Sequence, residues 1–259
     1  MLKELFYHCL ILIDRSGKLA DYVKNYAYDH HLPKEYRGRW KSDWTYKNYP
    51  HPGNLMILIG NQAMSVCIAK AACSNIKAIA IYDKTGVWHD ETPDIMHKLS
   101  EENGLLASIG KLRGHYPEGV LRFAVYNDPY KRLISIFQDK VKGPNTLLYY
   151  DRLGTKFDKS FAYFMTVVRH ELEKSDPLQM DDHIRRQTDY YTEDDVDYIV
   201  PIQYLDDFLR EHNLPLPPRH VNVSKKPKDY SEFEPFREEI QRLYARDYEL
   251  LKSKKLYRR

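Results

Sequence analysis

The chain has 259 residues, of which 42% are hydrophobic and 30% are charged, a composition typical of a folded globular protein and not of a disordered one. Its 40 basic and 37 acidic residues give a formal net charge of only +3, which does not indicate a nucleic-acid-binding protein. The length allows one large α/β domain, and we predict a single domain over residues 1–259.

The cysteines and the N-terminal residues indicate a reducing compartment. Cys9, Cys67 and Cys73 have neither the number nor the spacing of a disulfide framework or a zinc site, so we expect reduced thiols. The apolar run at residues 5–13 is interrupted by His8 and is far shorter than the ~20 residues of a membrane span. No small-residue cleavage site clearly follows it. We therefore predict a cytoplasmic protein without stable membrane insertion.

The first part of the chain contains irregular segments followed by strands and a helix. Residues 1–20 fit either a helix or a strand, and residues 21–53 have the composition of loops. Short apolar runs at 54–59 and 64–68 predict strands. Apolar residues at spacings of three and four then predict a helix that begins at Ser74 and ends at Gly86.

The second part continues the alternation of strands and helices. A strand is predicted at 121–126, followed by a helix that opens at Pro129, where the missing N–H costs nothing. Further on, the pattern predicts a helix at 161–172, a strand at 197–200, a helix through 205–209 and a last amphipathic helix over about 234–251. This alternation predicts an α/β fold with a central, mostly parallel sheet flanked by helices.

The strongest local signal is the segment Cys67-Ile-Ala-Lys-Ala-Ala-Cys-Ser-Asn-Ile-Lys77. It reads as a strand, a turn of small residues and a helix N-terminus, where unpaired N–H groups and the helix dipole favour an anion. Lys70 lies where its ammonium can reach the same anion. Two plainer interpretations stay open, since Ser74 fits an ordinary N-cap and Cys73 fits a small packing residue better than a nucleophile. The G-x-x-x-x-G-K-[ST] motif does not occur in the sequence.

Five segments in order resemble one enzyme family. Residues 68–77 are similar to the 5′-phosphosulfate-binding loop of Golgi-type carbohydrate sulfotransferases, the group with chondroitin and HNK-type enzymes. Asn127-Asp-Pro-Tyr-Lys-Arg-Leu-Ile-Ser135 resembles their 3′-phosphate-binding motif, and Asp182-His-Ile-Arg-Arg-Gln187 resembles their H-W-x-P-Q segment. His220-Val-Asn-Val-Ser224 and the stretch 243–251 resemble two later segments. The order and spacing of the five make the resemblance specific.

The resemblance implies a sulfotransferase fold, related in shape to the P-loop nucleotide kinases, and the sulfuryl donor 3′-phosphoadenosine 5′-phosphosulfate (PAPS), with PAP as product and no metal. Sulfuryl transfer is an in-line displacement in which charge grows on the leaving phosphate oxygen, so cations and amides aimed at that oxygen stabilise the transition state. The resemblance assigns this role to Lys70 and the 3′-phosphate to Ser135. The residues expected around the 5′-phosphate are Ala71, Ala72, Cys73, Ser74 and Asn75.

One position departs from the family pattern. The family has arginine where this chain has Asn127, and asparagine offers only a neutral donor to a phosphate. Lys225 or Lys226, beside Ser224, can supply the missing charge, because the late N-x-S segment lies near the sulfuryl donor in relatives. Arg132 matches a family arginine, and helix packing or a salt bridge stays open as its role.

The acceptor hydroxyl needs a general base, and histidine has a suitable pKa. His183 matches the family histidine, His115 is the second candidate, and His89 and Glu91 stay open. Contacts to the acceptor are expected from His183, Arg186 and Gln187, although a solvated charged turn explains the last two equally well.

The function predicted from the sequence is PAPS-dependent O-sulfotransfer to a carbohydrate, by a bacterial-type soluble member of the family. The alternatives are a nucleotide-dependent kinase and a non-catalytic binding protein that retains the fold. Residues 20–60 and 85–118 match the family poorly and are expected to shape the acceptor site.

Overall fold

The computed structural model describes residues 54–89, 93–143, 158–217 and 229–258. Within them, one five-stranded sheet has the strand order β3-β1-β2-β4-β5. The strands are β1 (Leu55–Ile59), β2 (Ala63–Val66), β3 (Leu106–Ser108), β4 (Leu121–Tyr126) and β5 (Tyr198–Pro201). The sheet is parallel from β2 through β4 to β5, whereas β1 pairs antiparallel with both β2 and β3. The predicted α/β fold is therefore confirmed, with a sheet that is only partly parallel.

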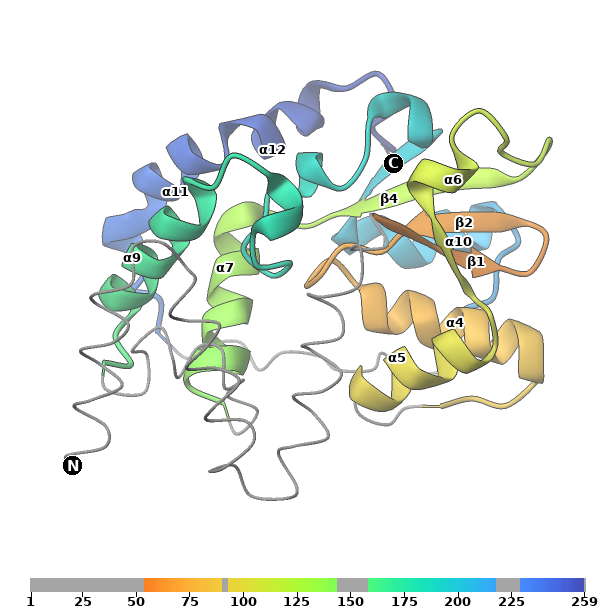
Figure 1. Ribbon diagram of the computed structural model, residues 1–259, viewed down its shortest axis with the longest axis horizontal. Helices are drawn as coiled ribbons and strands as arrows, with labels where there is room; N and C mark the ends of the chain where they lie inside the picture. Colours follow the sequence, from red (N-terminus) through yellow and green to blue (C-terminus); the bar gives the residue numbers. More distant parts are fainter. Residues whose placement is uncertain (1–53, 90–92, 144–157, 218–228, 259) are drawn as a thin grey trace. The chain divides into compact units, whose positions relative to one another are not determined.

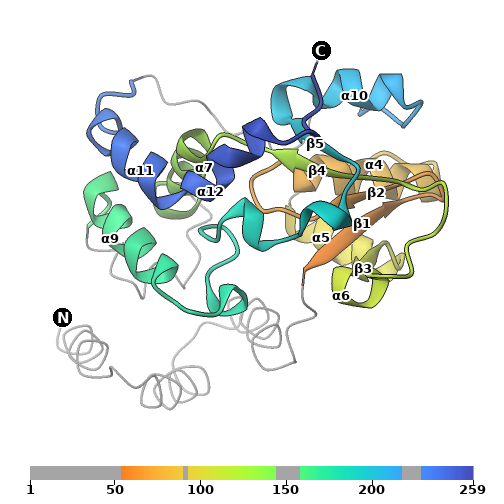
Figure 2. The ribbon, with the colours of Figure 1, turned by 90° about the horizontal axis from the view of Figure 1, so that it is seen from above.

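Helices lie against this sheet and beside it (Figure 1). The helices are α4 (Cys73–Thr85), α5 (Pro93–Glu102), α6 (Ile109–Leu112), α7 (Pro129–Ile136), α9 (Phe161–Leu172), α10 (Leu205–Glu211), α11 (Arg237–Leu243) and α12 (Ala245–Glu249). The π-helical turn η1 (Phe137–Val141) continues α7 directly. The 3-10 turns are η2 (Pro177–Gln179), η3 (Gln187–Asp189), η4 (Glu193–Asp195), η5 (Ile202–Tyr204), η6 (Glu234–Phe236) and η7 (Leu250–Lys252). In Figure 2, α7, α9 and α11 gather in one group, while α4 and α5 pack together at the sheet.

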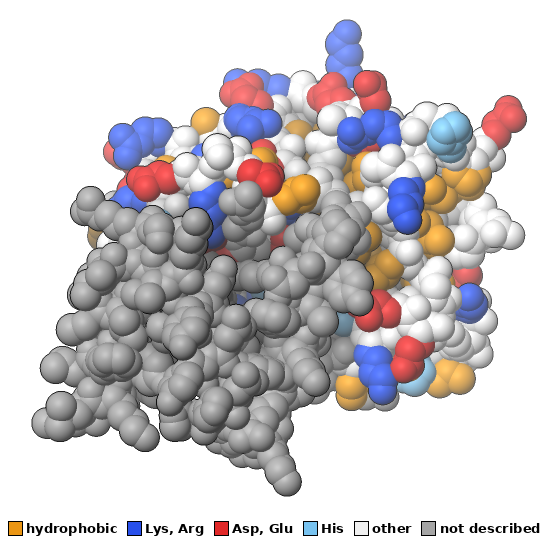
Figure 3. Space-filling view, in the orientation of Figure 1, with side chains coloured by type: hydrophobic (Ala, Val, Ile, Leu, Met, Phe, Trp, Pro, Cys, Tyr) orange, Lys and Arg blue, Asp and Glu red, His pale blue; other side chains and the backbone are white. Residues whose placement is uncertain are grey.

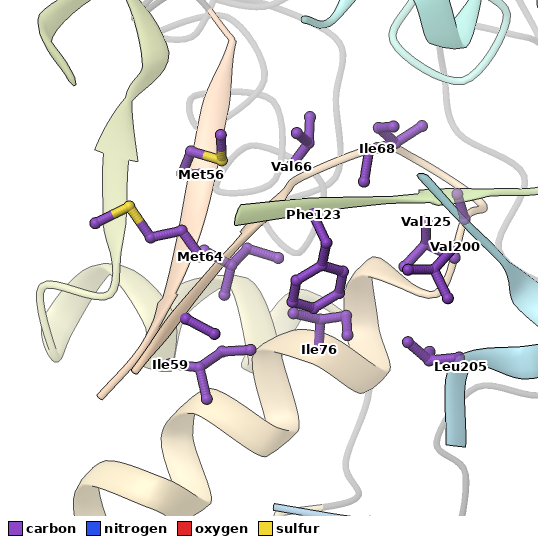
Figure 4. Packing of buried hydrophobic residues seen from close by; sticks show 14 of the residues in the cluster. Met56, Ile59, Met64, Val66, Ile68, Ile76, Phe123, Val125, Val200 and Leu205 are labelled. Atoms are coloured by element: carbon purple, nitrogen blue, oxygen red, sulfur yellow. The ribbon is translucent and has the colours of Figure 1, made fainter. Parts of the chain in front are cut away.

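Two apolar clusters hold the described residues together. In the first, Phe123 of β4 and Val200 of β5 point from the sheet toward Ile76 of α4 (Figure 4). The second is aromatic and lies among α7, η1 and α9, where the ring centroids of Phe137 and Phe161 are 5.1 Å apart in an edge-to-face arrangement. The first cluster fixes α4 against the sheet, and with it the loop that joins β2 to α4.

Two predicted signals for helix ends, Gly86 and Pro129, are confirmed, whereas the N-cap interpretation of Ser74 is wrong, because Ala72 is the N-cap of α4 and no side chain caps this helix. The N–H of Gly86 donates to Tyr82 O at 2.8 Å and ends α4 in the left-handed conformation. Asp128 caps α7 by accepting from the N–H of Lys131 at 3.0 Å, and Pro129 occupies the first turn. The end of α4 and the start of α7 therefore lie where the sequence predicts them.

The last helix and the segment 85–118 differ from the prediction. The helix predicted over 234–251 is divided into η6, α11, α12 and η7, with the break at Tyr244. Its hydroxyl is buried and donates to Ile184 O at 2.6 Å, so a tertiary contact competes with the regular helix here. Residues 85–118 contain α5, β3 and α6, none of which the sequence predicted.

The described surface carries both signs of charge. Basic and acidic side chains are interspersed on the face shown in Figure 3. None of the helices in the described ranges is long and apolar enough to cross a membrane. The same residues contain no group of three or more His, Cys, Asp or Glu side chains arranged to hold a metal ion.

Candidate active site around the β2–α4 loop

The loop from β2 to α4 is tightly turned. Lys70 and Ala72 both have a φ of 59°, a left-handed conformation that residues with a Cβ adopt rarely and at a cost of about 1 kcal/mol or more. Ala72 is the N-cap of α4, no side chain caps this helix, and its first turn contains no acidic residue. The first N–H groups of an α-helix have no intrahelical acceptor. The loop therefore presents a helix N-terminus suited to an anion.

Asn127 holds this loop in its unusual conformation. Its side-chain amide donates to the carbonyl oxygen of Lys70 at 2.8 Å. The backbone of Asn127 is fixed in turn by Gln187, which accepts from its N–H at 2.9 Å and donates to its carbonyl at 2.8 Å. The asparagine that departs from the family pattern thus has a positioning role at the end of β4.

Arg132 is a buried cation that binds carbonyl groups. Its side chain is 0% exposed, and its guanidinium donates to Ala69 O at 2.9 Å and to Arg185 O at 2.8 Å. A third contact reaches Asp182 O at 3.3 Å. The residue therefore joins the β2–α4 loop to the segment around His183. The sequence left helix packing or a salt bridge open as the role of Arg132. The structure shows instead that its guanidinium donates hydrogen bonds to backbone carbonyl groups.

Lys70 is paired with an acid from η1. Its ammonium donates to Asp139, which also lies 3.2 Å from the ammonium of Lys140. The Lys70 side chain is 11% exposed and that of Asp139 is 21% exposed. Burial lowers the pKa of Lys70, although the bond to Asp139 opposes this shift. Burial acts to raise the pKa of Asp139, but the bond and charge of Lys70 outweigh it and hold that pKa below its usual value.

A second lysine lies one turn into α4. Lys77 is 2% exposed, and its ammonium contacts Nδ1 of His97 from α5. Desolvation and the positive charge of Lys77 hold the pKa of His97 well below its usual value. His97 is therefore neutral at neutral pH, and its Nδ1 serves as the acceptor for the buried ammonium.

His183 lies in the segment that Arg132 joins to the loop. Its N–H donates to Asp181 Oδ1 at 2.9 Å, and its ring Nδ1 lies 3.3 Å from the same oxygen. The side chain is 25% exposed, and Arg132 ties the neighbouring Asp182 to the β2–α4 loop. The structure thus brings a histidine with an adjacent carboxylate to the same region as Lys70, although the ring Nδ1 makes no hydrogen bond.

Comparison with known proteins identifies the family. Residues 56–253 match the model of the sulfotransferase family, and this match spans the loop, α7 and the segment of His183. The chain belongs to the sulfotransferase family. No curated protein and no solved structure matches it. The resemblance found in the sequence is confirmed, and membership makes the protein a sulfotransferase, PAPS-dependent as the family is.

The residues at the loop fit the sulfuryl donor of this family. An uncapped helix N-terminus without acidic side chains is suited to a 5′-phosphate, and Lys70 lies in the loop that precedes it. Ser135 lies between Arg132 and Asp139 on one face of α7 and η1, since residues three and four apart are neighbours on a helix. Arg132 and Asp139 both bond to the loop, so Ser135 faces the same side. Its assignment to the 3′-phosphate stays a prediction.

Other predicted site residues of the sulfotransferase are placed differently. His115 precedes β4, whereas Asn127 follows it, so the six-residue strand puts about 20 Å between His115 and the loop. His89 follows the far end of α4. Gln187 is 0% exposed with its side chain bonded to Asn127 and Asp247, and Arg186 donates to Leu243 O at 2.9 Å. These contacts give Gln187 and Arg186 positions in the framework of the site. Four candidates lie outside the described residues: Glu91, Ser224, Lys225 and Lys226.

A cleft of about 720 Å³ opens at the N-terminal end of β4, lined by Tyr116, Arg122, Asp197 and His212 among others. Arg122 is already paired with Asp197 at 2.5 Å. This cleft lies at the opposite end of β4 from Asn127, which bonds to Lys70, so it is separate from the candidate site.

The sequence did not single out Asp139, Lys77 or His97 as site residues. A signal existed for Asp139, which follows Ser135 by four residues on the same helical face. His97 lies on α5, for which the sequence contains a weak helix signal. Pro93 opens the helix, and the apolar residues Met96 and Leu99 are three residues apart.

Proposed function

We propose that this sulfotransferase moves a sulfuryl group from PAPS to a hydroxyl of a carbohydrate. The observation that carries the proposal is that Lys70 lies in the loop before the N-terminus of α4, and that Arg132 ties this loop to the segment that contains His183. A cation and helix-terminal amides stabilise a leaving phosphate, and a histidine accepts the proton of an attacking hydroxyl. The proposed site therefore has groups that act on both the leaving phosphate and the attacking hydroxyl of an in-line displacement.

On the side of the sulfuryl donor, Lys70 exchanges one anionic partner for another. Its ammonium is bonded to Asp139, and a phosphate bound at the N-terminus of α4 competes for the same ammonium. The bonds from Asn127 and Arg132 to the loop backbone keep Lys70 and Ala69 in place during this exchange. PAPS, when bound, supplies the sulfuryl group and a phosphate leaving group. Lys70 then holds the charge that develops on the bridging oxygen.

On the acceptor side, His183 takes the hydroxyl proton at Nε2, because Nδ1 faces Asp181. The carboxylate of Asp181, 3.3 Å from Nδ1, stabilises the imidazolium that forms. A hydroxyl is a weak nucleophile until its proton is removed, so a base at this position raises the rate of transfer.

The carbohydrate acceptor is the finer part of the proposal. Its support is the similarity of the segments at 68–77, 127–135 and 182–187 to those of carbohydrate sulfotransferases. A kinase activity and a non-catalytic binding role are the outcomes against which it is tested. The cytoplasmic location predicted from the sequence stays a prediction.

The proposal is tested by incubating the purified full chain with sulfur-labelled PAPS and a panel of neutral and acidic oligosaccharides. We expect label on at least one oligosaccharide and a mass gain of one sulfate. Lys70→Ala should abolish the transfer, and His183→Gln should lower kcat while leaving the affinity for PAP unchanged. Transfer that does not need Lys70, or phosphate transfer from ATP in place of sulfate transfer, would overturn the proposal.

A further inference from the structure

Two ammonium groups share the carboxylate of Asp139. Lys70 comes from the β2–α4 loop and Lys140 from η1, and both contact the same oxygen, Oδ2, which lies 3.2 Å from the ammonium of Lys140. The side chains of Lys70, Lys140 and Asp139 are 11%, 14% and 21% exposed. No other acid in the described ranges forms an ion pair with either lysine. The cluster therefore sets two positive charges against one negative charge.

Asp139 and Lys140 are neighbours in the π-helical turn that continues α7. Side chains of adjacent residues do not face each other on a regular α-helix. Residues 137–141 instead form a π-helical turn, a geometry that occurs frequently at functional sites. Because both residues belong to one turn, the backbone keeps Lys140 near Asp139. Lys70, in contrast, comes from a separate loop, 69 residues before Asp139 in the chain.

A phosphate at the N-terminus of α4 competes with Asp139 for the ammonium of Lys70. If Asp139 had no second partner, this exchange would leave a carboxylate that is only 21% exposed without a counter-charge. An unpaired charge in such a place is strongly destabilising. The ammonium of Lys140 already lies 3.2 Å from the carboxylate, so Asp139 keeps one cation after Lys70 has left. The free energy needed to release Lys70 is therefore lower.

We propose that Lys140 is a positioning residue that keeps Asp139 paired while Lys70 turns to a phosphate bound at the N-terminus of α4. In the free protein the carboxylate bonds to both ammonium groups, and in the complex it bonds to Lys140 alone. Lys140 acts through Asp139 and does not contact the phosphate. Its effect on ligand binding rests on the proposed function, whereas its pairing with Asp139 in the free protein does not.

The first test needs no ligand. Urea denaturation of the full chain compares wild type with Lys70→Met, Lys140→Met and the double variant. In each single variant one ammonium still pairs with Asp139, whereas in the double variant the carboxylate has none. We expect the double variant to lose at least about fivefold more in the folding equilibrium constant than the two single losses combined. Independent losses would overturn the inference, because they would mean that neither lysine replaces the other.

The second test is a calorimetric titration with PAP. Lys140→Met should weaken PAP binding about five- to tenfold, because Asp139 then has only Lys70 as a partner and holds it more tightly. In the Asp139→Asn background the same substitution should change the affinity by less than about twofold, since no carboxylate is left to pair. A loss that persists in this background would overturn the inference, because it would place Lys140 on the phosphate itself. Unchanged PAP binding by Lys140→Met alone would also overturn it.

Lys142→Met is the matched control. Lys142 follows η1 and pairs with Glu232 at 2.9 Å, so this variant loses the same charge but leaves Asp139 with both partners. It should change the affinity for PAP by less than about twofold at physiological ionic strength. Its effect in urea should combine independently with that of Lys70→Met. Failure of wild type to bind PAP would count against the proposed function alone, because the urea measurements decide the pairing without PAP.

Discussion

Removing the ion pair between Lys70 and Asp139 is predicted to lower the stability of the free protein but to raise its affinity for PAP. The two side chains are 11% and 21% exposed. Exposed ion pairs contribute up to about 1 kcal/mol, whereas breaking a buried pair costs about 3–5 kcal/mol. The pair lies between these cases, and Lys140 lies 3.2 Å from the same carboxylate. We therefore expect Asp139→Asn to lower the free energy of unfolding of the free protein by about 1–2 kcal/mol.

The same substitution should strengthen the binding of PAP. In the free protein Asp139 neutralises Lys70, so a phosphate has to displace a carboxylate before it can bond to the ammonium. Without this competitor, about 1 kcal/mol is regained on binding, which corresponds to an affinity about fivefold higher. Urea denaturation measures the first effect, and calorimetric titration with PAP measures the second.

A matched control removes an ion pair elsewhere. Asp207 pairs with Arg210 of α10 at 3.0 Å, away from the loop. Asp207→Asn should leave the affinity for PAP unchanged. Weaker PAP binding by Asp139→Asn would refute the reasoning, because it would mean that Asp139 orients Lys70 toward the phosphate and does not compete with it.

Three further predictions concern the framework of the site and the sheet. Asn127→Ala removes the bond to the Lys70 carbonyl and should weaken PAP binding several-fold, measured by calorimetry, with about 1 kcal/mol lost in stability. Arg132→Lys keeps the charge but loses bonds to buried carbonyls, and should lower the free energy of unfolding by about 2–3 kcal/mol in urea. Asp195 is 0% exposed; burial acts to raise its pKa, but bonds from Arg113 and its other partners outweigh this and lower it. Because the pKa of Asp195 is lower in the folded protein, its ionised carboxylate stabilises the fold at pH values above about 3.9, the usual aspartate pKa. This stabilisation is lost progressively as the pH falls below that value. Asp195→Asn should therefore cost about 2–3 kcal/mol near pH 7, and the difference from wild type should narrow below about pH 4. A constant difference across pH would contradict this account.

Elements with strong local signals were predicted well from the sequence. The helix that opens at Pro129 has an aspartate cap, and the helix predicted at 161–172 has Ser160, whose hydroxyl accepts from the N–H of Tyr163 at 3.1 Å. Such caps act within one turn, so they can be read locally. The antiparallel pairing of β1 with β2 was missed, although Gly60 with a φ of 51° in a short connection is typical of a turn between paired strands.

The site was predicted only in part, because its partners come from distant segments. Lys70 and its loop were identified from the sequence, and the structure brings His183 to them. The carboxylate that pairs with Lys70 lies 69 residues further along the chain, and the histidine that pairs with Lys77 lies on a helix that the sequence did not reveal. Gln187 was interpreted as an acceptor contact, and its burial against Asn127 is a tertiary feature that no local pattern encodes.

The central claim is that the β2–α4 loop binds the phosphates of a sulfuryl donor through Lys70. The most direct test is a calorimetric titration of the full chain with PAP, compared with ADP and ATP and repeated with Lys70→Ala. Our account predicts micromolar binding of PAP that requires the 3′-phosphate and is at least tenfold weaker in Lys70→Ala. No binding of PAP, a preference for ATP, or equal affinity in the variant would contradict it.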